Sequence, residues 1–217
     1  MSAFPWKAVA WDIDGTLVDS EPLHHRALLA ACGEHGLDLR GLPETTFIGM
    51  HLRDVWAQLR PRLPETLAEA QFHGRIRHHY AAGAAGLGAI AGAVETIRAL
   101  DALGVAQVCA SNSGRAVVDA NLAAIDVTAL MRGTVSLDDV VEGKPAPEPY
   151  LRAARLIGTD PADILAVEDS LTGVRAARAA GMQVALLSHG ADGPPAGADA
   201  APHFRIAALE EILRLGR

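Results

Sequence analysis

Residues 8–21 read AVAWDIDGTLVDSE, and this stretch decides the fold. The apolar run from Ala8 to Asp12 stops abruptly at the polar IDGT, which is typical of a buried strand that opens into a loop. Asp12 and Asp14 stand two residues apart, so in extended backbone their carboxylates point to the same side. The stretch therefore predicts a strand that ends in a pair of acidic side chains.

Strands and helices alternate again beyond residue 104. The apolar runs that we interpret as strands span residues 105–111, 133–136, 164–169 and 183–188, and the helical segments after them span 114–124, 147–157, 171–180 and 207–215. Such alternation predicts a parallel sheet covered by helices on both faces, and the first strand belongs to the same sheet. We expect an α/β fold with a Rossmann-like parallel sheet as its core.

The stretch between these parts has a different pattern. Apolar residues recur at helical spacing from Pro22 to Tyr80, with breaks at Pro43, Pro61 and Pro64. Several glycines within residues 81–93 ease unusual backbone angles and indicate a linker. The sequence thus predicts a core domain made of residues 1–18 and 89–217, and an inserted all-helical domain made of residues 19–88.

The composition of the 217 residues excludes several classes of protein. The net charge is -7, and Lys7 and Lys144 are the only lysines, which argues against a nucleic-acid partner. No apolar run reaches the ~18 residues that cross a bilayer, and acidic residues interrupt the N-terminus before a signal peptide could form. The two cysteines, Cys32 and Cys109, cannot build a disulfide scaffold. We expect a cytoplasmic protein that does not bind membranes.

Polar residues gather at the ends of the predicted strands and in one loop that precedes a helix. They are Asp12, Asp14, Ser111, Asn112, Lys144, Glu168 and Asp169. Ligands of open α/β sheets bind beyond the carboxyl ends of the strands, so these side chains should converge. Clustered carboxylates are tolerated around a divalent cation, and their hard oxygen ligands suggest Mg²⁺. The lysine charge and the hydroxyl and amide donors complement a tetrahedral dianion, which makes phosphate the implied substrate group.

Each of these elements has a simpler interpretation when it is taken alone. A DxDG sequence is common in turns and in calcium-type loops. A Ser-Asn or Glu-Asp pair after a strand is usually a helix cap. The conjunction of all of them, in the order Asp, Ser, Lys and acidic pair, favours a phosphate site.

The same residues resemble the four motifs of the haloacid dehalogenase superfamily. The first motif is matched by DIDGTLVDSE at 12–21 and the second by Ser111-Asn112. The third is matched by GKP at 143–145 with PE at 147–148, and the fourth by EDS at 168–170 with Gly173. The helical insertion after the first motif resembles the C1-type cap of the subgroup that contains β-phosphoglucomutase, phosphoglycolate phosphatase and sugar-phosphate phosphatases.

The resemblance implies roles for the motif residues. Asp12 would be the nucleophile that becomes an aspartyl-phosphate, and Asp14 would protonate the leaving group and then activate water. Mg²⁺ would be held by Asp12, the backbone carbonyl of Asp14, Asp169 and also Glu168. The phosphoryl oxygens would be bound by Thr16, Ser111, Asn112 and Lys144, with a loop cap as the alternative role of Thr16.

The cap would choose the substrate. We expect His24, Gly49 and Arg53 to contact the substrate or the hinge, with a surface histidine and a solvated arginine as the alternatives. Asp19 and Ser20 are expected to cap the first cap helix, which has Glu21 in its first turn. The basic cluster at residues 73–79 is expected to form a solvated helix face.

Departures from the subgroup narrow the expected activity. Leu52 stands where mutases usually carry an arginine, and no lysine of the cap could form the Schiff base of a phosphonoacetaldehyde hydrolase. Asp14 argues against carbon–halogen cleavage. We expect a monomeric Mg²⁺-dependent phosphatase for a small phosphorylated metabolite, such as a sugar phosphate or phosphoglycolate. A phosphomutase is the alternative within the same chemistry, and a non-enzymatic phospho-aspartate switch is the alternative from another class.

Overall fold

The structure is a computed structural model that describes residues 4–47, 50, 52–188 and 201–216. The chain divides into two compact units, which we call the core unit (Met1–Asp19 with Gly88–Arg217) and the cap unit (Ser20–Leu87). Among the described residues, no helix combines the length and the apolar character that a membrane crossing requires. Cys32 and Cys109 are both buried free thiols, as the sequence predicts.

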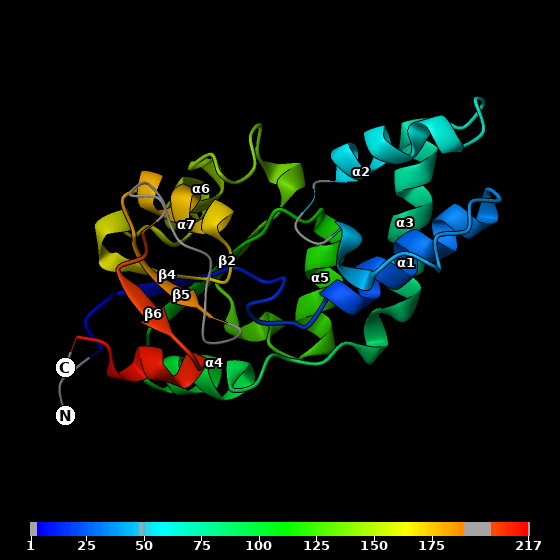
Figure 1. The fold of residues 1–217 in the computed structure, drawn as a ribbon. Coiled ribbons are helices and arrows are strands. Elements are labelled where there is room, and N and C mark those ends of the chain that lie inside the picture. Colours follow the sequence, from blue (N-terminus) through cyan, green and yellow to red (C-terminus); the bar gives the residue numbers. More distant parts are fainter. Residues whose placement is uncertain (1–3, 48–49, 51, 189–200, 217) are drawn as a thin grey trace. The chain divides into compact units, whose positions relative to one another are not determined.

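The core unit is built on a six-stranded sheet in the order β3-β2-β1-β4-β5-β6 (Figure 1). Every pairing in it is parallel, which confirms the predicted α/β class. The strands are β1 (Ala8–Trp11), β2 (Ala106–Ala110), β3 (Thr134–Val135), β4 (Ile164–Glu168), β5 (Gln183–Leu187) and β6 (Phe204–Ile206). The short edge strand β6 was not predicted.

The helices of the core unit are α4 (Ala93–Ala102), α5 (Arg115–Ala124), α6 (Glu148–Ile157) and α7 (Leu171–Ala179). Helix α4 was not predicted from the sequence, and it begins at the end of the glycine-rich linker. The helix predicted at 207–215 is instead the 3₁₀ helix η8 (Leu209–Arg214). Its two buried side chains, Leu209 and Ile212, are three residues apart, which suits the three-residue turn of a 3₁₀ helix.

The two faces of the sheet are covered by different helices. Ala8 and Ala10 of β1 pack in one apolar cluster with Tyr150 of α6 and Val174 of α7. On the other face, Trp11 donates its indole N–H to Gln107 Oε1 at 3.0 Å, and Gln107 Nε2 donates to the carbonyl of Ile97 in α4, also at 3.0 Å. Figure 1 shows α6 and α7 on one side of the strands and α4 on the other. The alternation of side chains along β1 thus gives a sheet buried on both faces.

The cap unit contains α1 (Glu21–Glu34), α2 (Leu52–Leu59) and α3 (Glu69–Gly83). Helices α1 and α3 pack together and bury Leu23 and Ala27 of α1 with Phe72 and Ile76 of α3. Ser20 occupies the N-cap position of α1, but its side chain makes no capping hydrogen bond, so the predicted cap is wrong in its chemistry. The helix begins instead with a proline in its first turn, which suits the start of a helix. The negative charge of Glu21 in the same turn interacts favourably with the positive end of the helix dipole.

An ion cluster joins α3 to the end of α1. Arg75 donates its Nε–H to Glu34 Oε2 at 2.6 Å, and His79 Nε2 lies 2.8 Å from Glu34 Oε1. Arg75, with a smaller effect of His79, lowers the pKa of Glu34 to about 2. Arg77 and His78 are exposed, as expected of a solvated face, whereas His73, Arg75 and His79 are partly buried, and the last two hold two cap helices together.

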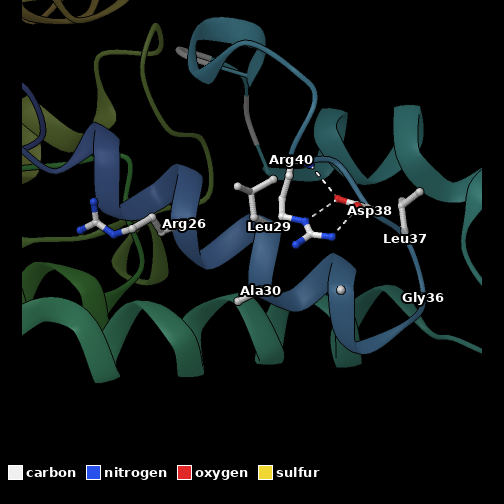
Figure 2. A pocket seen from close by; sticks show the side chains of 8 residues that line it. Arg26, Leu29, Ala30, Gly36, Leu37, Asp38 and Arg40 are labelled. Carbon is white, nitrogen blue, oxygen red and sulfur yellow. Dashed lines mark hydrogen bonds and ion pairs between the residues drawn. The ribbon is translucent and has the colours of Figure 1, made fainter.

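A hollow of about 430 Å³ opens on the cap unit beside the second half of α1 (Figure 2). Its lining residues are Arg26, Leu29, Ala30, Gly33, Gly36, Leu37, Asp38 and Arg40. Arg40 binds Asp38 in a forked arrangement, with Nε 3.0 Å from Oδ1 and Nη2 2.7 Å from Oδ2 (Figure 2). Asp38 thus offsets the charge of Arg40, and Arg26 is a second arginine in the lining.

Candidate active site

The polar residues of the core unit meet where β1 ends between its two neighbours. Strand β1 pairs with β2 on one side and with β4 on the other, so the carboxyl ends of these three strands are adjacent. The N–H of Asp12 donates to the carbonyl of Val167 at 3.0 Å, and the N–H of Ser111 donates to that of Val135 at 2.9 Å. Backbone pairing thus continues one residue past each strand and fixes both side chains at this edge.

A buried network connects Asp12 with Lys144, Glu168 and Tyr150. Lys144 Nζ donates to Asp12 Oδ1 at 2.6 Å and to Glu168 Oε1 at 2.5 Å. The hydroxyl of Tyr150 donates to the same Glu168 oxygen at 2.6 Å, and the ammonium lies 4.9 Å from the centre of the tyrosine ring. Lys144 is 4% exposed and Glu168 is 0% exposed. These partners therefore hold the lysine in one position without help from solvent.

The charges at this edge of the sheet are unbalanced. The carboxylates of Asp12, Asp14, Glu168 and Asp169 outnumber the ammonium of Lys144. Burial raises the pKa of Asp12 well above its usual value. Lys144 opposes this rise, and the other carboxylates add to it. Burial alone would lower the pKa of Lys144, but Asp12 and Glu168 outweigh it and raise that pKa. The surplus of negative charge indicates that a cation belongs here.

The structure supplies a ligand set for such a cation. Among the described residues, Asp12, Glu168 and Asp169 each offer a carboxylate oxygen, and these oxygens lie within 4.8 Å of one another. Gly15 has a φ of +81°, and a Cβ at this position would lie 2.2 Å from Asp169 Oδ2. The DxDG glycine thus leaves the space that Asp169 occupies. An all-oxygen carboxylate set fits Mg²⁺.

The start of α7 is shaped around Glu168. The hydroxyl of Ser170 donates to Glu168 Oε2 at 3.1 Å and accepts the N–H of Gly173 at 3.0 Å. A Cβ on Gly173 would lie 1.8 Å from Glu168 Oε1, so only glycine leaves room for this buried carboxylate. Both oxygens of Glu168 are therefore hydrogen-bonded, and one of them binds Lys144.

Asp14 has a separate set of partners on the β2 side. Its Oδ2 accepts from the hydroxyls of Ser113 at 2.8 Å and Ser111 at 3.2 Å, and its Oδ1 accepts from the amide of Asn121 at 2.9 Å. The Ser111 hydroxyl also accepts the N–H of Ser113 at 2.9 Å. Asp12 and Asp14 therefore face different groups, Lys144 for Asp12 and the serine and asparagine donors for Asp14.

The other two predicted phosphate ligands hold neighbouring parts of the site. Asn112 donates its amide N–H to the carbonyl of Lys144 at 3.0 Å and accepts the N–H of Lys144 at 2.8 Å. Its side chain thus fixes the backbone that carries the lysine. Thr16 is fully buried, and its hydroxyl lies 3.5 Å from Asp169 Oδ1.

The predicted cap residues lie in the other unit. His24 stacks on Tyr80 of α3 with ring centroids 4.4 Å apart. Arg53 is 84% exposed and its Nε lies 4.0 Å from Asp54 Oδ1. Gly49 lies outside the described residues. For Arg53 this is the solvated environment that the sequence analysis gave as the alternative.

Three residues of the site were not predicted from the sequence: Ser113, Asn121 and Tyr150. One of them left a readable signal, because Asn121 stands on the apolar face of the helix predicted at 114–124, where Val117, Val118 and Leu122 are buried beside it. A polar side chain on a buried stripe usually has a polar partner. Ser113 adjoins the predicted Ser111-Asn112 pair, and Tyr150 looks like an ordinary core aromatic.

Comparison with known proteins places the chain in a family. Residues 6–181 match the haloacid dehalogenase-like hydrolases. The plasmid phosphoglycolate phosphatase of Cupriavidus necator is 36% identical, over 91% of this chain and 89% of its own. Hexitol phosphatase A of Escherichia coli is 31% identical, over 87% of this chain and 86% of its own.

A crystal structure of CbbY from Rhodobacter sphaeroides in complex with phosphate has the same fold, with a TM-score of 0.83 and 23% identity. The match covers 95% of this chain and 96% of that one. The motif residues, the parallel sheet and these relatives agree, and the chain belongs to the haloacid dehalogenase-like hydrolase family, among its phosphatases.

Proposed function

We propose that the protein is a Mg²⁺-dependent phosphatase that hydrolyses a small phosphomonoester through a phosphorylated Asp12. One observation carries the proposal: the Asp12 carboxylate is held 2.6 Å from the Lys144 ammonium, within a set of carboxylates that suits a cation. Relatives named for phosphoglycolate and hexitol phosphates support a small metabolite as the substrate.

In the first step, a carboxylate oxygen of Asp12 attacks phosphorus, and the bond from phosphorus to the substrate oxygen breaks. Asp14 gives a proton to the departing alkoxide. In the second step, a water molecule attacks phosphorus and gives a proton to Asp14, and the bond between phosphorus and Asp12 breaks. Inorganic phosphate leaves, and both aspartates regain their starting forms.

The residues that would hold Mg²⁺ are Asp12, Asp169 and the backbone carbonyl of Asp14. When bound, the cation supplies positive charge that lets a phosphate dianion approach this acidic edge. Glu168 contributes less directly, because Lys144 and Tyr150 already bind one of its oxygens.

Lys144 and Ser111 are proposed to bind the phosphoryl oxygens. Lys144 lies beside the nucleophile, so its charge offsets the charge that the incoming phosphoryl group brings. Thr16 and Asn112 are assigned a supporting role, since their polar groups already face Asp169 and the Lys144 backbone.

The cap unit is proposed to select the substrate. His24 and Gly49 remain candidates for contacts with the part of the substrate that does not react, and Arg53 is an exposed cation that could approach a second anionic group. Cytoplasmic location and a monomeric state remain predictions.

A metabolite screen tests the proposed function. Purified protein would be incubated with Mg²⁺ and single compounds, among them 2-phosphoglycolate, hexose phosphates and hexitol phosphates, and released phosphate would be measured. We expect turnover of at least one compound and no turnover by Asp12→Asn, whose fold is checked by circular dichroism. Phosphate release by Asp12→Asn within about tenfold of the wild-type rate would refute the nucleophile.

A further inference from the structure

Asn121 is a buried polar residue that the mechanism above does not use. It lies inside α5, its side chain is 0% exposed, and Val117, Val118 and Leu122 on the same helix are buried. An asparagine amide in such a place is unfavourable twice, because it is a weak helix former and because burying an amide without partners costs free energy. An apolar residue would serve the packing of α5 better.

The partner of Asn121 explains why an amide stands there. Its Nδ2 donates to Asp14 Oδ1 at 2.9 Å, across 107 residues of sequence. The two serine hydroxyls of the β2–α5 connection bind the other oxygen, at 2.8 Å from Ser113 and 3.2 Å from Ser111. A carboxyl group with donors on both oxygens cannot turn about its Cβ–Cγ bond without breaking a hydrogen bond.

The three donors differ in how firmly they are fixed. Hydroxyl groups can rotate their hydrogens, so the serines can follow Asp14 when its surroundings change. The planar amide of Asn121 has no such freedom, and its helix anchors it. Of the three donors, Asn121 therefore does most to set the plane of the Asp14 carboxyl.

We propose that Asn121 is a positioning residue that holds Asp14 in the orientation from which it protonates the leaving group. The proposal rests on the acid role of Asp14 given above. It assigns to Asn121 no contact with the substrate and no proton of its own. Without this donor, the carboxyl group of Asp14 samples other orientations, and protonation of the leaving oxygen becomes less frequent.

The expected effect depends on the leaving group, which separates positioning from folding. An alkoxide needs a proton as it leaves, whereas p-nitrophenolate leaves without one. Loss of Asn121 should therefore slow phosphorylation of the enzyme by an alkyl phosphate much more than phosphorylation by p-nitrophenyl phosphate. A general loss of folded protein would slow both by the same factor.

The test measures the phosphorylation step in single turnovers with p-nitrophenyl phosphate and with 2-phosphoglycolate or fructose 1-phosphate, whichever is turned over faster. Asn121→Leu keeps the branched shape and the number of side-chain heavy atoms, and it removes the donor. We expect a loss of roughly 10- to 100-fold with the alkyl phosphate, typical of one hydrogen bond to a charged group. The loss with p-nitrophenyl phosphate should stay below about 3-fold. Asn121→Gln, which keeps an amide donor, should restore part of the alkyl phosphate rate.

Two further variants serve as controls. Val118→Ala removes buried volume from the same helix, and it should lower thermal stability without changing the ratio of the two rates. Asp14→Asn should change the ratio in the same direction as Asn121→Leu and at least as strongly. If Asn121→Leu does not fold, Asn121→Ala takes its place in the same measurement.

The outcomes separate this inference from the proposed function. If Asp14→Asn slows the alkyl phosphate more than p-nitrophenyl phosphate, but Asn121→Leu slows both substrates equally or slows neither, the positioning role alone is overturned. If Asp14→Asn slows both substrates by the same factor, the acid role and the inference are overturned together. If both variants slow the alkyl phosphate more than p-nitrophenyl phosphate, and Asn121→Gln restores part of the alkyl phosphate rate, the inference is supported.

Discussion

Replacement of Lys144 by methionine would show how strongly the buried ion network stabilises the core unit. The ammonium lies 2.6 Å from Asp12 Oδ1 and 2.5 Å from Glu168 Oε1, and its side chain is 4% exposed. Lys144→Met keeps most of the side-chain volume but leaves two buried carboxylates without their cation. Removing one partner of a buried ion pair typically costs about 3–5 kcal/mol. For a protein of this size, the melting temperature should fall by roughly 6–20 °C.

Lys7→Met is a matched control, because these are the two lysines of the sequence. Lys7 also binds a carboxylate at short range, with Nζ 2.6 Å from Asp163 Oδ2, but its side chain is 73% exposed. An exposed pair contributes little, so the melting temperature should stay close to that of the wild type. Both variants would be unfolded by heat and by urea in EDTA, with circular dichroism as the signal.

The pH dependence gives the sign of the effect. Asp12 and Glu168 raise the pKa of Lys144, so its stabilising charge is fully present at neutral pH in the wild type and is lost only in strong alkali. Lys144 opposes the rise that burial causes in the pKa of Asp12, so in Lys144→Met the Asp12 carboxyl holds its proton more tightly in the folded state than in the unfolded state. Relative to the wild type, the variant should therefore lose stability over the pH range that begins at the ordinary pKa of an aspartate and extends upward. A deficit that shrinks over this range, or that is no larger than in Lys7→Met, would refute the reasoning.

Three further predictions follow from the same geometry. Gly173→Ala places a Cβ 1.8 Å from Glu168 Oε1, and it should lower the free energy of unfolding by about 1–3 kcal/mol; an unchanged urea midpoint would argue against this crowding. Gly15→Ala meets both a φ of +81° and Asp169 Oδ2 at 2.2 Å, so phosphatase activity should fall even in folded protein, and retained turnover would contradict the proposed ligand cradle. EDTA should abolish turnover, and excess Mg²⁺ should restore turnover and raise the melting temperature. Full activity in chelator would reject the metal site.

The sheet and the main motif residues could be predicted because local signals and topology agree. The apolar run at Ala8 to Asp12 ends in acidic residues, and later strands end in polar residues too. Parallel strands bring such ends to one edge, so a one-dimensional pattern gives a three-dimensional cluster. This is why the sequence alone groups Asp12 with Asp169.

The division of labour inside the cluster could not be predicted. The sequence shows that Glu168 and Asp169 are neighbours, but it does not show which partners each side chain meets. In the structure Glu168 is buried and binds Lys144 and Tyr150 through one oxygen, while its other oxygen accepts from Ser170. Such differences depend on side-chain directions and on partners that are remote in the sequence.

Ser113 and Asn121, which bind Asp14 together with the predicted Ser111, escaped prediction for a related reason. Ser113 and Asn121 bind Asp14 across 99 and 107 residues, and neither belongs to a stretch that resembles a family motif. The hydrogen bonds of Arg75 and His79 to Glu34 are equally remote, at 41 and 45 residues. Helical periodicity predicts which face of a helix is buried, but it does not predict which polar group of another element contacts that face.

Trapping of the phosphorylated enzyme tests the central claim most directly. Wild-type protein would be mixed with Mg²⁺ and a substrate found in the screen, quenched in acid within the first turnover, and digested for mass spectrometry. The proposed mechanism predicts one added phosphoryl group on the peptide that contains Asp12, and none on that peptide in Asp12→Asn. A phosphoryl group on another residue, or steady phosphate release by Asp12→Asn, would contradict it.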